Sequence, residues 1–587
     1  MEVSIIDWVI IVLFFAITLL LGLVASRKSS KSSEEFFLSG RNLPWWMLGV
    51  SMVATTFSAD TPNLVTGFVR TNGVARNWEW WAFLLTGMTT VFVYAKLWRR
   101  SGIVTDLEFY ELRYSGQAAS FLRGFRAIYL GVFFNIMIMA SVMLAGIKFG
   151  SVMLGLTDVQ TVLLVSVVTV FYSSMGGLRG VILTDFFQFG LSMLGMIVAA
   201  IYILQMPEVD GMTGLLTHTA VQSKTSLLPD FSQPEVAIPI FIMPLAVQWW
   251  SVWYPGAEPG GGGYIAQRML SAKNENDATK ATFLFNIAHY ALRPWPWIII
   301  ALASLVFFPE LSDLKERFPH ISDDLIKDDL AFPAMLTLLP SGLMGLLLAS
   351  IIAALMSTIS THLNWGSSYI VNDVYNRFIS PDADESSKVL VGRIATVVLM
   401  ILAAVFSLEL ESAMEAFQIL LKIGAGTGLL FILRWFWWRI NAYAEIVAML
   451  VSFMLAIFFK YFYQGSMADY EIMLWSIAVT TISWLITCFV TPTTDMDVMK
   501  RFLLLIKPHK AGWKPVLNQL ERSESMAYYS VKTSFARELG MVVCGAVLIY
   551  FILFGTGYLI YGNYTYFLIS LVIVAFAGLI LYKLWKD

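Results

Sequence analysis

A row of small and polar side chains runs through one long apolar segment, residues 347–370. Its members recur every three or four residues, so they share one face of a helix that is long enough to cross a bilayer. Oxygen atoms inside a membrane suit a small hard cation such as sodium, although serine, threonine and alanine are also common where membrane helices pack closely. A cation site and close packing are therefore both open for this row, which consists of Ser350, Ala354, Ser357, Thr358, Thr361, Asn364 and Ser368.

Two other apolar segments contain residues that interrupt a helix. The first includes Asp60 and Pro62, and the proline removes a backbone donor and disfavours helix at Thr61. The second, residues 253–263, has two prolines and five glycines in eleven residues, a composition that does not form a regular helix. Unrelated kinks, or a simple loop at the second segment, would give the same pattern.

The spacing of the two interruptions favours a transporter. They lie in the second and seventh apolar spans, and interrupted helices at matching positions of two halves are typical of transporter binding sites. Unwound backbone leaves carbonyl groups for a cation, and the ends of half-helices add partial charge. An odd number of spans in each half would make the two halves inverted repeats.

Charged side chains at membrane depth are costly and usually functional. Structural alternatives exist for several of them. Glu79 lies in an aromatic belt typical of a membrane interface, and Asp185 suits a helix N-terminus. Arg293 would hold an anionic solute or pair with an acid such as Glu258, and Lys422 has the same two interpretations. The full set is Asp60, Glu79, Lys148, Asp185, Glu258, Arg293 and Lys422.

The composition indicates a membrane protein. Of 587 residues 58% are hydrophobic, the mean hydropathy is +0.70, and only 14% are charged, against about 25% in soluble domains. The net charge of −2 gives no reason to expect nucleic acid as a partner. The sequence contains no phosphate loop, Cys/His metal spacing or nucleophile elbow. We therefore expect a protein that is not an enzyme and that uses an ion gradient as its energy source.

Apolar segments of roughly 20 residues recur from end to end, and we expect about fifteen transmembrane helices in the plasma (inner) membrane. Arg27, Lys28 and Lys31 follow the first segment, which places the N-terminus outside. Alternation then puts the most basic loops inside and leaves the C-terminus in the cytoplasm, which requires an odd number of spans. The segments are 5–26, 45–70, 77–99, 119–148, 158–176, 179–205, 236–255, 277–308, 342–371, 387–409, 412–434, 441–463, 470–491, 537–559 and 564–584.

Four stretches give the chain a resemblance to the solute:sodium symporter family, which includes sodium/sugar and sodium/proline symporters. They are residues 35–46, residues 175–178 with Thr184, Asp185 and Gln188, the pair Gln267 and Arg268, and residues 354–358 with 373–375. The resemblance covers roughly residues 1–490. It implies an all-α membrane protein with the inverted five-helix repeat of the leucine transporter, one leading helix and further accessory helices.

The resemblance also implies which residues bind sodium. In the family, backbone oxygens of the first broken helix and hydroxyl groups of the span that is ninth here form the sodium site. Asp185 matches an acid that helps sodium to leave towards the cytoplasm. Asn364 and Ser368 gain no such support and are interpreted as packing residues. The implied ligands are the carbonyl groups of Ala54, Phe57 and Ala354 and the hydroxyl groups of Ser357 and Thr358.

On the solute side the chain departs from the sugar branch of the family. Glu79 matches an acid that contacts sugar, but Thr61 and Ala82 stand where that branch has a glutamine and a serine, and about Leu421 where it has a further glutamine. We expect the solute between spans two, three, seven and eleven. The candidate solute-binding residues are Thr56, Asp60, Thr61, Glu79, Tyr254, Glu258, Arg293 and Lys422.

The expected organisation has six parts. A leading helix and a cytoplasmic linker occupy residues 1–44, and the two five-helix repeats occupy 45–206 and 236–438. Two accessory helices (439–491), a cytoplasmic loop (492–536) and two C-terminal transmembrane helices (537–587) follow. The repeats are the parts that bind sodium and solute.

The sequence thus predicts a sodium-coupled secondary active symporter that imports a small polar organic solute by alternating access. A sugar is one candidate for the solute. Alternatives are an amino acid, a carboxylate or sialic acid, for which Arg293 or Lys422 would matter. An alternative of another class is a channel or a solute sensor without coupled transport. The expected partners are sodium, the solute and lipid, and we expect a monomer or weak oligomer.

Overall fold

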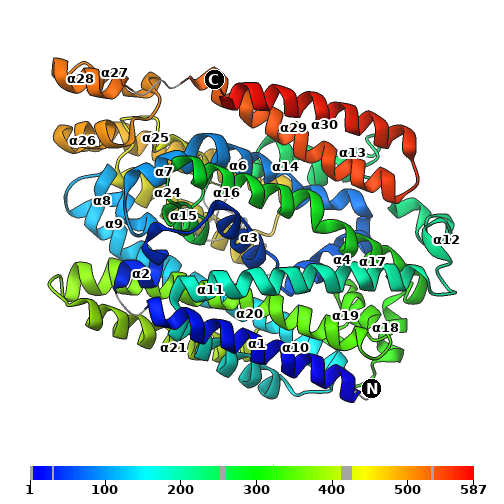
Figure 1. The fold of residues 1–587 in the computed structure, drawn as a ribbon. Helices are drawn as coiled ribbons and strands as arrows, with labels where there is room; N and C mark the ends of the chain where they lie inside the picture. Colours follow the sequence, from blue (N-terminus) through cyan, green and yellow to red (C-terminus); the bar gives the residue numbers. More distant parts are fainter. Residues whose placement is uncertain are drawn as a thin grey trace.

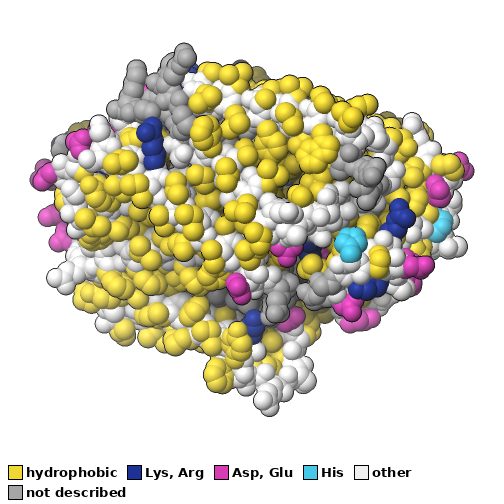
Figure 2. All heavy atoms as spheres, turned by 90° about the horizontal axis from the view of Figure 1, so that it is seen from below, with side chains coloured by type: hydrophobic (Ala, Val, Ile, Leu, Met, Phe, Trp, Pro, Cys, Tyr) yellow, Lys and Arg dark blue, Asp and Glu magenta, His cyan; other side chains and the backbone are white. Residues whose placement is uncertain are grey.

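The computed structural model describes residues 4–29, 32–251, 259–321, 323–410, 426–530 and 534–586. Within these ranges the chain is helical and forms no β-strand apart from an isolated bridge between Leu43 and Ala272. The long helices run side by side, parallel or antiparallel to one another (Figure 1). Figure 2 shows a largely hydrophobic surface, on which most of the visible charged side chains lie towards the two ends. Such a surface suits a protein that is surrounded by lipid.

Ten helical segments of the described chain are long and apolar enough to cross a membrane. They confirm a multi-pass membrane protein. The expected total of about fifteen crossings is not reached by single helices, because the other expected spans are shorter, interrupted or partly outside the described ranges. The ten segments are Ile5–Val24, Gly116–Leu154, Gly177–Leu204, Glu275–Phe307, Leu343–Ile379, Glu385–Glu409, Ala442–Phe462, Asp469–Val490, Phe535–Ile560 and Tyr564–Lys586.

The second expected span is broken, but not where the proline suggested. Helix α3 (Trp45–Thr56) ends before Phe57, and helix α4 (Asp60–Asn72) begins three residues later. Thr61 is helical, which corrects the expectation that Pro62 would exclude helix there. Pro62 lies in the first turn of α4, where its missing N–H would have had no partner within the helix. The break therefore consists of residues 57–59.

Helix α20 (Leu343–Tyr369) is the central element of the described fold. It packs against α1 (Ile5–Ser29), α3, α10 (Asn135–Phe149), α11 (Asp158–Leu204) and α21 (Glu385–Glu409). Nearly all of its side chains are buried, including every member of the polar row. The polar row therefore faces protein rather than lipid.

Helix α11 joins two expected spans, 158–176 and 179–205, into one element. Its helical course changes at Gly177, whose φ of 53° is in the left-handed region that favours glycine. A Cβ atom at this position would lie 2.7 Å from the carbonyl oxygen of Phe36. This glycine therefore allows both the change of direction and the close approach of α2 (Ser33–Leu38).

The last two helices form an antiparallel hairpin that packs on the helical core. Helix α29 (Phe535–Ile560) contacts α30 (Tyr564–Lys586), α6 (Leu84–Thr89) and the π-helical segments η3 (Thr90–Tyr94) and η10 (Ala288–Leu292). The indole N–H of Trp295 donates to the Leu553 carbonyl at 3.1 Å, and the Tyr550 hydroxyl donates to the Trp81 carbonyl at 2.9 Å. The hairpin is thus bound to the core by polar as well as apolar contacts.

The two ends of the molecule carry different loops (Figure 1). The N-terminus lies at the same end as α12 (Gly211–Thr217) and α18 (Leu311–Arg317). The C-terminus lies towards the opposite end, near α26 (Met496–Ile506) and α28 (Arg522–Tyr529). Termini at opposite ends agree with an odd number of crossings.

Replacing Gly177 by alanine should destabilise the protein. The backbone of Gly177, with φ 53° and ψ −161°, lies in a region that is essentially confined to glycine and costs another residue about 1–3 kcal/mol, and the added methyl group would press on the Phe36 carbonyl. The melting temperature of the purified protein in detergent is the measurement. Gly190→Ala is the matched control on the same helix, because nothing lies within 4 Å of its added Cβ. Equal melting temperatures for the two variants would contradict the role assigned to Gly177.

Candidate functional site

The end of helix α3 is bonded to the polar row of α20. The Thr358 hydroxyl lies within hydrogen-bond distance of two carbonyl oxygens, that of Thr55 at 2.9 Å and that of Ala354 at 3.1 Å. Thr55 is one residue from the end of α3, so its carbonyl has no partner further along its own helix. Thr358 supplies that partner from α20. Carbonyl and hydroxyl oxygens of the two helices therefore gather at the break.

A carboxylate from α11 joins the same region. The Ser357 hydroxyl donates to Asp185 Oδ1 at 2.6 Å, and the Ser51 hydroxyl of α3 donates to Asp185 Oδ2 at 2.6 Å. All three side chains are buried. Asp185 is thus not a terminal acid that stabilises a helix dipole, since it lies inside α11 and connects α3 to α20.

The second interrupted region contributes a buried base to this polar cluster. Arg268 lies on α15 (Gly263–Leu270), which begins after Gly260 and Gly261, both with positive φ. Its Nη2 donates to the Thr361 hydroxyl at 2.8 Å and lies 3.8 Å from Asp185 Oδ2. Both broken regions therefore meet on one face of α20.

Asn364 belongs to this polar cluster as well. Its Oδ1 accepts a hydrogen bond from the Gln267 amide at 3.0 Å, so its interpretation as a packing residue is incomplete. Ser368, in contrast, donates only within its own helix, to the Trp365 carbonyl at 2.7 Å. The polar row therefore bonds to other helices from Ser350, whose hydroxyl also reaches the Leu191 carbonyl of α11 at 3.1 Å, as far as Asn364, and only Ser368 is bonded locally.

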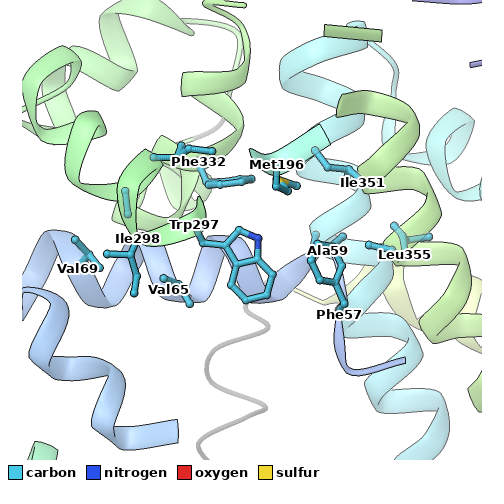
Figure 3. Close-up of a cluster of buried hydrophobic side chains, with 14 of the residues drawn as sticks. Phe57, Ala59, Val65, Val69, Met196, Trp297, Ile298, Phe332, Ile351 and Leu355 are labelled. Carbon is cyan, nitrogen blue, oxygen red and sulfur yellow. The ribbon is translucent and has the colours of Figure 1, made fainter. Parts of the chain in front are cut away.

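Phe57 anchors the break through its side chain. Its N–H donates to the carbonyls of Val53 and Ala54 at 2.9 and 3.1 Å, and its backbone then leaves the helix. The ring lies 5.1 Å from the ring of Trp297 and points into a hydrophobic cluster with Met196, Ile351 and neighbours (Figure 3). Apolar packing thus fixes the residue whose backbone forms the break.

A cavity of about 180 Å³ opens beside the break. Four of the predicted solute-binding residues line it: Thr56, Asp60, Thr61 and Arg293. Lining residues that the sequence analysis did not assign to the solute include the aromatic rings of Trp80, Tyr264 and Tyr290, together with Lys148, His289 and Asp329. Lys148 was recognised as a buried charge, whereas the aromatic residues gave no signal among the many aromatics of this chain.

Two ion pairs hold the segment that follows α18, and one of them, between Lys148 and Asp329, lines the cavity. Lys148 Nζ lies 2.9 Å from Asp329 Oδ2, and Arg70 Nε lies 2.8 Å from Asp328 Oδ1. The two acids belong to the short helix η12 (Asp328–Leu330), so α10 and α4 both hold this helix. Asp328 and Asp329 were not singled out from the sequence, and two adjacent acids between apolar spans are the signal that could have indicated them.

Glu79, which was also predicted to bind the solute, is not among the residues that line the cavity. Glu79 pairs with Arg76 at 2.9 Å, and its backbone carbonyl accepts from Gln248, while its neighbour Trp80 faces the cavity. Tyr254, Glu258 and Lys422 lie outside the described residues. Their predicted contact with the solute, like that of Glu79, stays a prediction.

Comparisons with known proteins agree on the class of this chain. A model of the sodium:solute symporter family matches residues 36–452. A sodium/glucose cotransporter of Vibrio parahaemolyticus is 27% identical and aligns over 84% of this chain and 92% of its own length. A sodium/mannose cotransporter of Bos taurus is 27% identical over 68% of each chain.

A solved structure has the same fold. It is a sodium-coupled sialic acid symporter in a substrate-bound outward-open state, with a TM-score of 0.69, 22% identity, and coverage of 84% of this chain and 100% of that chain. At this identity the likeness concerns the fold, which is the leucine-transporter-like fold expected from the sequence. Because the family model covers more than half of its residues, this chain belongs to the sodium:solute symporter family, and it is a sodium-coupled symporter.

Proposed function

We propose that the protein imports a small neutral polar solute, with a sugar as first candidate, together with sodium by alternating access. One observation carries this proposal: the last turn of α3 reaches both places, because the Thr55 carbonyl accepts a hydrogen bond from Thr358 of α20 while Thr55 and Thr56 both line the solute cavity. Neighbouring residues of one turn thus serve both substrates. The relatives named above, cotransporters of glucose and mannose, support a sugar.

In this proposal sodium binds at the break of α3. Its ligands are the carbonyls of Ala54, Phe57 and Ala354 and the hydroxyls of Ser357 and Thr358. Each hydroxyl donates its proton to a protein oxygen, Ser357 to Asp185 and Thr358 to a backbone carbonyl, so its lone pairs remain for a cation. An all-oxygen set of neutral ligands beside one carboxylate suits a monovalent hard cation.

The cavity carries balanced charge along its described lining. Arg293 and Lys148 are basic, and Asp60 and Asp329 are acidic. A neutral solute with several hydroxyl groups leaves this balance intact, because each hydroxyl both donates and accepts hydrogen bonds. The rings of Trp80, Tyr264 and Tyr290 offer flat apolar surfaces to the C–H faces of such a solute.

An acidic solute is the second candidate. Arg293 is buried at the cavity, and its described hydrogen-bond partners, Thr56 and His289, are neutral. A carboxylate of an amino acid or sialic acid would compensate this guanidinium directly. Thr61, Glu79 and, outside the described residues, Tyr254, Glu258 and Lys422 complete the proposed solute set.

The proposed topology places the N-terminus outside and the C-terminus in the cytoplasm of the plasma (inner) membrane. The two repeats, 45–206 and 236–438, follow a leading helix and linker (1–44) and precede the accessory helices (439–491). The loop 492–536, basic in sequence, lies inside, and the hairpin 537–587 ends the chain. Asp185, bonded to Ser357, then lies where sodium leaves towards the cytoplasm.

Ser357→Ala combined with Thr358→Ala should raise the sodium concentration for half-maximal uptake by about tenfold or more. Each lost interaction with a charged group is worth about 1.5–3 kcal/mol, and 1.4 kcal/mol corresponds to a factor of ten. The measurement is sodium-dependent uptake into proteoliposomes. Ser368→Ala is the control, since that hydroxyl bonds only to Trp365 in its own helix. Unchanged sodium dependence in the double variant would refute the ligand assignment.

Asp185→Asn and Arg268→Gln should each lower the melting temperature, because each leaves a fully buried charge without its partner, at a cost of about 3–5 kcal/mol. The double variant should lose less than the sum of the two single losses. Strict additivity would show that Arg268 and Asp185 do not interact. If Asp185 also serves sodium exit, Asp185→Asn should slow solute release into the lumen more than it weakens sodium binding from outside.

A panel of radiolabelled solutes in proteoliposomes tests the class of substrate. D-glucose, D-mannose and D-galactose should accumulate under an inward sodium gradient, while proline and N-acetylneuraminate represent the alternative of a solute that carries a carboxylate. Uptake should stop when sodium is replaced by potassium. Flux that equilibrates the solute without regard to the direction of the sodium gradient would indicate a channel instead.

A further inference from the structure

Three buried side chains at the cavity form a hydrogen-bond chain whose direction is fixed by chemistry. Arginine only donates, so His289 Nε2, 3.2 Å from Arg293 Nη2, must accept and carries no proton. The ring proton is therefore on Nδ1, which donates to the Thr56 hydroxyl oxygen at 2.8 Å. Thr56 in turn donates its own proton to the Val53 carbonyl at 2.9 Å.

The guanidinium at the start of this chain is held on several sides. Its Nη1 donates to Thr56 at 3.2 Å, and its carbon lies 5.9 Å from the ring centre of Trp80 and 5.2 Å from that of Trp297. Arg293 is 2% exposed, and its Nε has no hydrogen-bond partner among the described residues. A buried donor without a partner is costly, and this one belongs to a side chain that lines the cavity.

The other end of the chain reaches the proposed sodium site. Val53 immediately precedes Ala54 and Thr55 in the last turn of α3. The Thr55 carbonyl accepts from Thr358, and the Ala54 carbonyl is a proposed sodium ligand. The guanidinium thus reaches this turn by two routes, directly from Nη1 to Thr56 and through the ring of His289 by three hydrogen bonds.

The local structure favours a functional role for these residues. His289 lies in the π-helical segment η10, and Arg293 follows it directly, before Pro294 at the start of α17 (Pro294–Phe307). Short π-helical segments inside helices occur often at functional sites. The η10 geometry places His289 and Arg293, four residues apart, in direct contact beside the break of a different helix.

We propose that Arg293 binds an acceptor oxygen of the solute and that His289 is the positioning residue that transmits this binding to the sodium-binding turn of α3. The inference rests on the proposed function and deepens it, since it names a specificity residue and a coupling route. The solute must present an oxygen acceptor at this point, a hydroxyl or a carboxylate. When that oxygen binds, the orientation of Arg293 is fixed, and with it His289, Thr56 and the end of α3.

Two substitutions of His289 separate positioning from simple packing. His289→Leu fills space but breaks the chain, whereas His289→Gln offers a carbonyl to Arg293 and an N–H to Thr56. We expect the leucine variant to raise the KM for solute about tenfold and to lose the dependence of solute KM on sodium concentration. The glutamine variant should restore most of the solute affinity and most of the dependence of the solute KM on sodium concentration. Thr282→Ala, which alters a buried hydroxyl bonded within α16 (Glu275–Ile287) of the same span, is the control.

The measurements are uptake of D-glucose and N-acetylneuraminate into proteoliposomes at several sodium concentrations, and the shift of melting temperature by sodium alone. Sodium alone should still raise the melting temperature of the leucine variant, and this result would show that its sodium site is folded. Arg293→Lys should strongly raise the KM for whichever of the two probes the wild-type protein transports. That probe is glucose if Arg293 binds a hydroxyl group, and N-acetylneuraminate if it binds a carboxylate.

Unaltered kinetics in His289→Leu would overturn the proposal. So would a glutamine variant no better than leucine, because the ring would then matter only for packing. A wild-type protein without sodium-stimulated uptake of any panel solute would instead overturn the proposed function itself. The two failures are therefore distinguishable.

Discussion

The architecture depends on one constraint: a helix that stops inside a membrane leaves backbone carbonyls that only other protein groups can satisfy. In this chain the exposed end is that of α3, and the Thr358 hydroxyl of α20 satisfies the Thr55 carbonyl. The burial of the polar row on α20, the position of Asp185 between Ser51 and Ser357, and the packing of Phe57 on Trp297 all serve this junction. The interruption of this helix is tolerated because hydroxyl groups of α20, those of Thr358 and Thr361, lie beside the end of α3.

The same junction explains how two substrates become linked. Thr55 and Thr56 are adjacent, and consecutive residues of a helix point in different directions. The Thr55 carbonyl is bonded to α20 and both residues line the cavity, so a displacement of this turn changes the contacts at both places. Coupling in this geometry needs no long pathway, because the two sites share one turn of α3 and are joined by a short chain of hydrogen bonds.

Local features of the sequence predicted much of this arrangement, whereas contacts between residues far apart in the chain were not predicted. An interruption in the second span, the shared face of the α20 polar row, and the presence of Asp60 and Arg293 at membrane depth follow from spacing, proline and the cost of charge in lipid, although the break lies at residues 57–59 and not at Thr61. The approach of Arg268 to Asp185 joins residues far apart in the chain, and no periodicity indicates such a contact. The span total was uncertain for a related reason, because interrupted crossings such as α3 with α4 lack one continuous apolar helix. For Glu79 the reason is different. Its ion-pair partner Arg76 is only three residues away, and this local pairing competes with a role of Glu79 in solute binding.

The C-terminal hairpin has a consequence for motion. Its inner helix, α29, docks on α6 and η3 and on η10, elements of the third and eighth expected spans, which occupy equivalent places in the two proposed repeats. A movement of one of these spans against the other would disrupt the packing of α29, so the hairpin favours a rocking cycle in which both spans belong to one moving body. A hairpin attached in this way enlarges the moving body without adding a hinge. Two C-terminal helices can therefore be present without blocking the transport cycle.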